Sequence, residues 1–235
     1  MATPETTTRP WVLLISLSYR EYFDELQATL LSALHAKANV QCVKVSALAL
    51  TELSRQPAPS AVLITDEGPA IRDREHTMVW DAVLEYIRQG GTTVIMGHFS
   101  SFVLPFDMRE FFGKAGLPWQ GGWYQFGRTK LQLNPAATTY NPAANLVPEF
   151  SQKALCVDNV ALSDSWYTIK ADPRIQSEVS DPDAPGQAPV AFARVGNGML
   201  GYVGDVSAET GSDAAILAMC GLSGGEPANG VANGV

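Results

Sequence analysis

The sequence predicts an α/β protein with a flavodoxin-like core, a doubly wound and mostly parallel sheet, to which a β-rich C-terminal half is added. Two observations predict this class. In the N-terminal half, short apolar runs alternate with stretches whose apolar residues recur at helical spacing, which is typical of parallel β-α units. After Trp119, proline and asparagine separate the apolar runs, which favours antiparallel strands and long loops.

The predicted parallel core begins with the apolar run WVLLISLS at 11–18, which indicates a strand buried on both faces. A helix is expected next, because apolar residues recur at helical spacing at Phe23, Leu26, Leu30 and Leu34. A second helical face, with Val79 and Val83, is stopped by Gly90-Gly91. The remaining core strands are expected at 40–46, 61–66 and 92–97.

The C-terminal half is expected to add mainly β structure over 120–205. Before it, Asp107 followed by Glu110 has the N-cap pattern of a short helix. Near its end, Gly196-Asn197-Gly198 predicts a tight hairpin, because Asn-Gly supplies the positive φ that such turns need. A last helix is expected to start at a Ser212 cap and to run to about Cys220.

Composition indicates one large domain and opposes several classes of partner. A chain of 235 residues, 46% hydrophobic and 17% charged, suits a single domain over 1–222 with a disordered tail at 223–235. The net charge of -8 opposes nucleic-acid binding, which depends on clustered Lys and Arg. No apolar run approaches the roughly 20 residues of a membrane span, and no signal peptide is recognisable, so we expect no membrane partner and a cytoplasmic protein.

The three cysteines, Cys42, Cys156 and Cys220, form no metal-binding or disulfide pattern. We expect them to be buried core thiols, the usual fate of free cysteine. No Gly-rich phosphate cradle precedes a helix, and the histidines and carboxylates have no fixed metal-ligand spacing. The sequence therefore predicts neither a cofactor nor a metal.

The segment YIRQGGTTVIMGHFSS, residues 86–101, resembles class I glutamine amidotransferase-like domains, in which a helix, a Gly-Gly stop and a strand lead into the nucleophile elbow. The resemblance extends to the trehalose-utilisation-type branch, whose corresponding strand ends near a histidine, as this strand does at His98. The segments ISLSYREYFDEL, ITDEGPAI, GHFSSF, GLPW and YVGDVSAE also resemble a group of filamentous-fungal proteins of this superfamily that often carry a lipase label. The likeness covers nearly the whole chain, from Trp11 to Leu222.

A glutaminase of this family needs a cysteine at the elbow and a histidine downstream to activate it. This chain has Gly97, His98, Phe99 and two serines at the turn, and His98 is its last histidine. We therefore expect no glutamine hydrolysis by the family mechanism.

Ser100 or Ser101 is the alternative nucleophile, with His98 or His76 as its base and Asp66 or Glu67 to orient that base. The lipase pattern G-x-S-x-G is absent. Both serines are also explained by caps of the next helix or loop, which is the more common role.

Polar residues follow three predicted strands at one end of the sheet, where ligands bind in open parallel sheets. The residues of this expected site are Ser16, Ser18, Tyr19, Arg20, Asp66, Glu67 and His98. Asp66 and Glu67 could act as acid and base or hold a sugar hydroxyl, but capping, or pairing with Arg20 or Arg72, is the more common role of such residues. Asp205 follows the hairpin and either faces the site or, with Glu209, caps the last helix. Trp123 and Tyr124 either cover the site or seal the core.

Two functions follow from these residues. In the first, an amidotransferase-like domain without the Cys-His-Glu triad binds a small polar molecule or a protein partner at the former active site. In the second, the protein is a hydrolase or lyase that uses Ser100 or Ser101. The sequence favours the first function, because no triad residue stands at any of the triad positions that can be mapped. A homodimer is compatible with the sequence.

Overall fold

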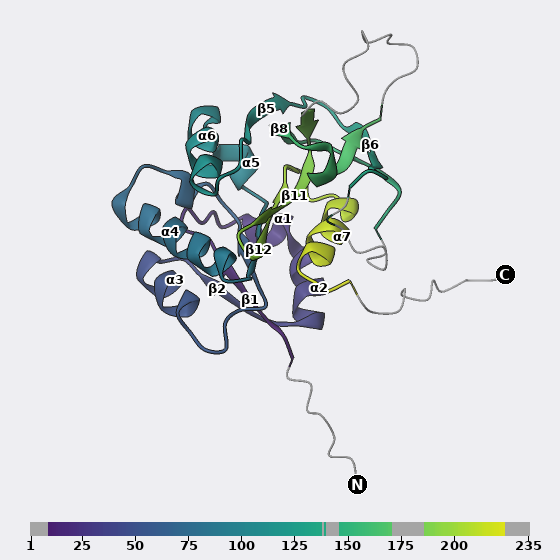
Figure 1. Ribbon diagram of the computed structural model, residues 1–235. Helices are drawn as coiled ribbons and strands as arrows, with labels where there is room; N and C mark the ends of the chain where they lie inside the picture. The colour runs from purple at the N-terminus through teal and green to yellow at the C-terminus, as the bar shows by residue number, and fades with distance from the viewer. Residues whose placement is uncertain (1–8, 138, 140–145, 171–185, 224–235) are drawn as a thin grey trace, which may run out of the picture.

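The computed structural model describes residues 9–137, 139, 146–170 and 186–223, where helices pack on both faces of a nine-stranded sheet (Figure 1). A second, three-stranded sheet is formed by β5 (Gln120–Tyr124), β8 (Leu155–Val160) and β10 (Gly186–Ala188). The mixed α/β class predicted from the sequence is confirmed. Residues 224–235 of the predicted tail lie outside the described residues.

Five parallel strands form the first part of the large sheet, in the order β2-β1-β3-β4-β12. A strand lies in each of the four predicted core segments but ends earlier than expected. Polar residues begin the loops after β1, β2 and β3, and the turn at Gly97 ends β4. Their bounds are β1 Trp11–Ile15, β2 Asn39–Val43, β3 Ala61–Ile64, β4 Thr92–Ile95 and β12 Gly198–Val203.

Successive residues of β1 belong to different halves of the core, as expected for a strand covered on both faces. Val12 and Leu14 join the cluster under α1, α2 and α7, whereas Leu13 and Ile15 join the cluster under α3, α4 and α6. Figure 1 shows these two helix groups on opposite sides of the sheet. Their bounds are α1 Phe23–Leu26, α2 Ala28–Lys37, α3 Ser46–Leu53, α4 Arg74–Arg88, α6 Pro105–Lys114 and α7 Thr210–Met219.

Beyond β12 the large sheet continues with four antiparallel strands, as the change of pattern after Trp119 predicts. They are β11 (Val190–Val195), β9 (Ser165–Ile169), β6 (Thr129–Leu133) and β7 (Glu149–Gln152). The hairpin of β11 and β12 is confirmed. Its positive φ of 61° belongs to Gly196, however, and not to Asn197, which is the arrangement of a type II′ turn.

Two predicted helix caps are wrong. Helix α6 starts at Pro105, because proline suits the first helical position, and Asp107 therefore lies inside the first turn. Helix α7 starts at Thr210, and Ser212 lies inside it, where its hydroxyl donates to Gln152 Oε1 at 2.9 Å.

Two of the three cysteines are core thiols as predicted. Burial raises the pKa values of Cys156 and Cys220 to about 12. The prediction is wrong for Cys42, which is exposed because β2 is an edge strand of the sheet. None of the described helices has the length and apolar character needed to cross a bilayer.

Candidate functional site

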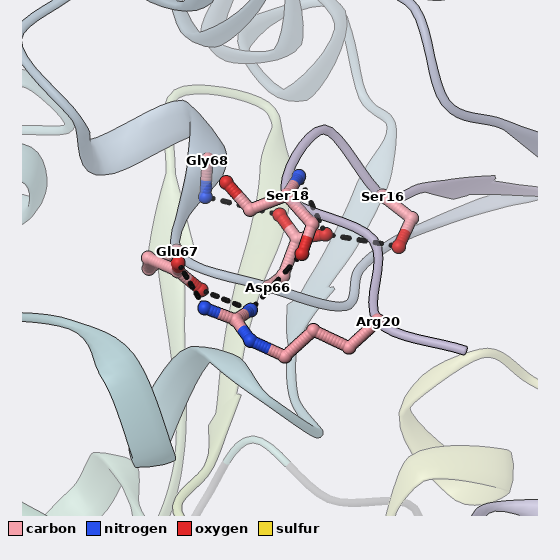
Figure 2. Close-up of polar contacts among 6 residues, drawn as sticks. All are labelled: Ser16, Ser18, Arg20, Asp66, Glu67 and Gly68. Atoms are coloured by element: carbon pink, nitrogen blue, oxygen red, sulfur yellow. Dashed lines mark hydrogen bonds and ion pairs between the residues drawn. The ribbon is translucent and has the colours of Figure 1, made fainter. Parts of the chain in front are cut away.

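The candidate site lies at the carboxyl ends of β1 and β3, the neighbouring strands between which the order of the parallel sheet reverses. The loop after β1 carries Ser16, Ser18 and Arg20, and the loop after β3 carries Asp66 and Glu67. Figure 2 shows that the two loops meet through these side chains.

Asp66 joins the two loops from inside the protein. It is 1% exposed, and its carboxylate accepts hydrogen bonds from Ser16 Oγ (2.9 Å), Ser18 N (3.0 Å) and Gly68 N (3.0 Å). Burial raises the pKa of Asp66, and these three hydrogen bonds oppose the rise because they stabilise the charged form. The carboxylate thus holds together the loops that follow β1 and β3, on either side of the crevice between these strands.

Glu67 and Arg20 form a two-pronged ion pair at the rim of this crevice (Figure 2). Arg20 Nη1 lies 3.0 Å from Glu67 Oε2, and Nη2 lies 2.7 Å from Oε1. Nη1 also donates to the carbonyl oxygen of Ser18 at 3.0 Å. The guanidinium carbon lies 3.5 Å from the ring centroid of Phe102, so the pair is held in one position by a cation-π contact as well.

His98 lies beside this ion pair but is packed inside aromatic side chains. It is 3% exposed, and its ring centroid lies 4.6 Å from that of Tyr22 and 5.3 Å from that of Phe23. Its Nε2 is buried and makes no hydrogen bond with the described residues. Burial, followed by the positive charge of Arg20, lowers the pKa of His98, so the imidazole is neutral near pH 7.

The sharp turn between β4 and α5 (Phe99–Phe102) is made by Gly97, which has a φ of +64°. A Cβ atom at this position would lie 3.0 Å from a ring carbon of Phe23 and 3.1 Å from the carbonyl oxygen of Thr65. The residue at the turn therefore presents no side chain, and its surroundings leave little room for one.

The two candidate serines lie on α5 and differ in their surroundings. Ser100 is buried, and its Oγ lies 3.1 Å from the hydroxyl of Tyr202, which in turn donates to the carbonyl oxygen of Leu155 at 2.7 Å. Ser101 is exposed. Within the described residues, neither hydroxyl is hydrogen-bonded to His98 or His76, and their catalytic roles stay predictions.

A groove of about 530 Å³ opens beside the ion pair. Glu67, Phe102 and Arg72 belong to its wall. The wall also includes Val103, Leu104, Phe106 and Asp107. Sequence reasoning missed this groove, because the apolar stretch FVLPF, which joins the end of α5 to the start of α6, was too weak a signal to identify it. Arg72 pairs with Glu110 at 2.7 Å and with Asp107 at 3.7 Å, and not with Asp66 or Glu67.

Other residues expected at the site have different neighbours. Asp205 accepts hydrogen bonds from Ser207 N (2.8 Å) and Glu209 N (2.7 Å), both in the turn before α7. Glu209 is the N-cap residue of α7, but the helix has no side-chain cap hydrogen bond, so the expected cap is wrong. Trp123 and Tyr124 lie on β5, where Trp123 N donates to Gln187 Oε1.

Tyr19 bonds Asp24 through its hydroxyl at 2.9 Å. His76 lies in the first turn of α4. Among the described residues, none of these side chains contacts Asp66, Glu67 or His98 through a hydrogen bond, ion pair or ring contact. The residues that the structure describes contain no group of three or more His, Cys, Asp or Glu side chains that could hold a metal ion.

Comparison with known proteins yields likeness of structure only. No family model matches the chain, and no curated protein matches its sequence. A ThuA-like protein from Bacteroides uniformis superposes with a TM-score of 0.54 at 11% identity, over 94% of each chain. A ThuA-like protein from Parabacteroides merdae gives 0.52 at 14% identity, over 91% of this chain and 89% of the other.

A β-galactosidase from Bacillus circulans gives a TM-score of 0.55 at 12% identity, over 91% of this chain but 31% of the enzyme. The predicted resemblance to lipase-labelled fungal proteins finds no support in these comparisons. At such identities the likeness concerns the fold alone, and by fold this chain is similar to ThuA-like proteins.

Proposed function

We propose that this chain is a class I amidotransferase-like domain, without the Cys-His-Glu triad, that binds a small polar ligand with an apolar face. The proposed site is the groove beside the Arg20–Glu67 pair. The strand order β2-β1-β3-β4-β12 also supports the finer assignment to a flavodoxin-like core.

The groove is the observation that carries this proposal. Its volume of about 530 Å³ falls within the range of small-molecule sites, roughly 300–1,000 Å³. It shares Glu67 and Phe102 with the crevice at the strand ends, where open α/β sheets bind their ligands.

The lining of the groove defines the chemistry of the ligand. Phe102 and Phe106 are exposed and offer apolar ring surface. Glu67 and Asp107 supply carboxylate oxygens, which accept hydrogen bonds from hydroxyl or ammonium groups. Arg72 adds a donor, and its guanidinium carbon lies 4.6 Å from the ring centroid of Phe106. A polyol, a sugar or an aromatic amine fits these features.

The turn at Gly97 supports a non-catalytic role. A nucleophile at a strand-to-helix elbow needs a side chain on the strained residue, and here that residue is glycine. No histidine follows His98 in the sequence. We expect no release of ammonia from glutamine, and release that is lost in Cys156→Ser would contradict this part of the proposal.

A hydrolase or lyase that uses Ser100 or Ser101 is the second candidate. The observation in its favour is the free Nε2 of His98 beside Glu67 and Arg20, because an unpaired imidazole nitrogen is what a general base needs. The contact between Ser100 and Tyr202 and the burial of His98 favour binding over this alternative.

The test is a thermal-shift screen with polyols, monosaccharides and aromatic amines, followed by titration calorimetry of any hit. In Phe106→Ala the affinity of the hit should fall about tenfold, which corresponds to about 1.4 kcal/mol. Phe126→Ala is the matched control, because Phe106 and Phe126 are 67% and 85% exposed and only Phe106 lines the groove.

Equal binding by both variants would place the ligand elsewhere. Hydrolysis of an aryl ester that is lost in both Ser101→Ala and His98→Ala would favour the second candidate. The exposed Leu104 at the rim also suits a protein partner or a second copy of the chain. To test for a second copy, light scattering measures whether the molecular mass increases with protein concentration. Loss of that increase in Leu104→Glu would support a second copy as the occupant.

A further inference from the structure

A second and much smaller cavity lies at the carboxyl ends of β4 and β12, at the N-terminus of α7. It has a volume of about 10 Å³, which is room for the centre of a single water-sized molecule. Its wall includes Gln27, Gly97, Asp205, Ser212 and Asp213, all of them buried. The cavity shares no residue with the groove, so an inference about it does not depend on the proposed function.

Asp213 is a buried carboxylate that lacks a partner at one oxygen. The residue is 6% exposed, and its Oδ2 makes no hydrogen bond with the described residues. Buried carboxylates are normally paired or fully hydrogen-bonded, because an isolated charge is costly to remove from water. Because Asp213 lines the cavity, an occupant that supplies positive charge or hydrogen-bond donors would give this carboxylate the partner that it lacks.

Asp205 adds a second negative charge to the same wall. Its oxygens already accept hydrogen bonds from the backbone N–H groups of Ser207 and Glu209. Asp205 and Asp213 are the titratable groups among the lining residues, and every other lining side chain is uncharged. The negative charge of the cavity is therefore not balanced by its own wall.

The size of the cavity and the number of carboxylates select the occupant. A bound divalent metal usually has three or more His, Cys, Asp or Glu ligands, and no such group exists among the described residues. We propose that the cavity binds one water-sized monovalent cation, ammonium, potassium or sodium, held by Asp213 and Asp205. A cation of this size relieves the repulsion between the two carboxylates and gives Asp213 Oδ2 a partner.

A proton competes with the cation for Asp213. Burial, followed by the charge of Asp205, raises the pKa of Asp213 to about 6. The carboxylate is therefore charged at pH 8 and largely neutral at pH 5, so cation binding should be present at pH 8 and lost at pH 5.

The experiment measures the melting temperature of the full chain at pH 8 in chlorides of tetramethylammonium, sodium, potassium and ammonium at one ionic strength. Tetramethylammonium is too large for the cavity and is the reference. At least one small cation should raise the melting temperature by about 3 °C over the reference, because a ligand that binds only the folded state stabilises it. The cation with the largest shift is the one that the cavity prefers.

Asp213→Asn should abolish this difference between the salts, whereas Asp81→Asn, which removes an exposed carboxylate, should keep it. If Asp213→Asn does not fold, loss of the difference in the unmodified protein at pH 5 is the equivalent result. Equal melting temperatures in all four chlorides at pH 8 would mean that the cavity takes water only and would overturn the proposal. A difference that survives in Asp213→Asn or at pH 5 would overturn it as well.

Discussion

A single residue decides what the turn after β4 can do. Gly97 adopts a positive φ that costs a residue with a side chain about 1–2 kcal/mol, and the ring of Phe23 and the carbonyl of Thr65 crowd the position of a Cβ atom. Backbone geometry and packing thus both select glycine here. The same turn brings His98 close to the Arg20–Glu67 pair without exposing it.

Gly97→Ala should lower the free energy of unfolding by about 1–2 kcal/mol, because alanine tolerates this φ poorly. The measurement is urea denaturation at neutral pH. Gly113→Ala is the control, since Gly113 lies inside α6 with no atom near an added Cβ, and alanine favours a helix there. Equal stability of Gly97→Ala and the parent chain would mean that the turn adopts a different backbone conformation.

Asp213 should make stability depend on pH in the sense opposite to that of a paired carboxylate. Its pKa is raised from 3.8 to about 6 in the folded protein, so between these values the folded state holds the proton that the unfolded state releases. The stability that Asp213 contributes through this proton is fully present below about pH 4 and is lost as the pH rises through about 6.

Asp213→Asn removes this titration. Both proteins are compared in tetramethylammonium chloride. As the pH rises from 4 to 7, the free energy of unfolding of the variant should increase by about 1–2 kcal/mol relative to that of the parent chain, with allowance for solvent screening. Urea denaturation of both proteins at several pH values measures this difference. A difference that does not change with pH would contradict the assignment.

At the scale of elements, the hairpin of β11 and β12 joins the two halves of the protein through close backbone contact. The first residue of β12, Gly198, lies against the end of α4, where Met199 N donates to the carbonyl oxygen of Gly91 at 3.0 Å. An added Cβ at Gly198 would lie 2.1 Å from that oxygen and 2.2 Å from the carbonyl oxygen of Ile87. The hairpin can therefore reach β4 only with glycine at this position.

Gly198→Ala should destabilise the protein by about 3 kcal/mol, the upper part of the range for overpacked sites, because backbone atoms cannot move aside as flexible side chains do. Thermal and urea unfolding measure the loss. Gly186→Ala is the matched control in another strand, since no atom lies within 4 Å of its added Cβ, and it should have little effect. Similar losses in both variants would argue against the contact with α4.

At the scale of the molecule, one sheet runs through both halves of the chain. The parallel pair β4–β12 and the antiparallel pair β12–β11 connect the α/β half to the β-rich half without a break. Residues of both halves also share one hydrophobic cluster, in which Ile95 and Phe112 lie with Val157 and Ala191. Such continuity is typical of a single cooperative unit.

We therefore expect the two halves to unfold together. Hydrogen exchange followed by mass spectrometry should give β3 and β9 the same opening free energy, equal to that of global unfolding in urea. Earlier opening of β9 with β3 still protected would show that the C-terminal half is a separate unit, contrary to the single domain predicted over 1–222.

The sequence alone determined the class of the fold, because apolar periodicity and glycine stops are local signals. The strand 11–18, the Gly90-Gly91 stop and the hairpin at Gly196 could all be predicted in this way. Composition also determined that no histidine follows His98. Helix starts at Asp107 and Ser212 were predicted wrongly, since Pro105 and the tertiary contact with Gln152 outweighed the capping patterns.

Only the tertiary structure decided which side chains meet. Asp66 and Glu67 were expected near Arg20 from the topology. The hydrogen bonds that Ser16 and Ser18 donate to Asp66, however, depend on the register of β1 and β3. The groove at Phe106 and the unpaired oxygen of Asp213 had no local signal strong enough to identify them. The physical reason is that a sequence pattern reports burial and periodicity along the chain, whereas the partner of a polar group is set by strands and helices distant in sequence.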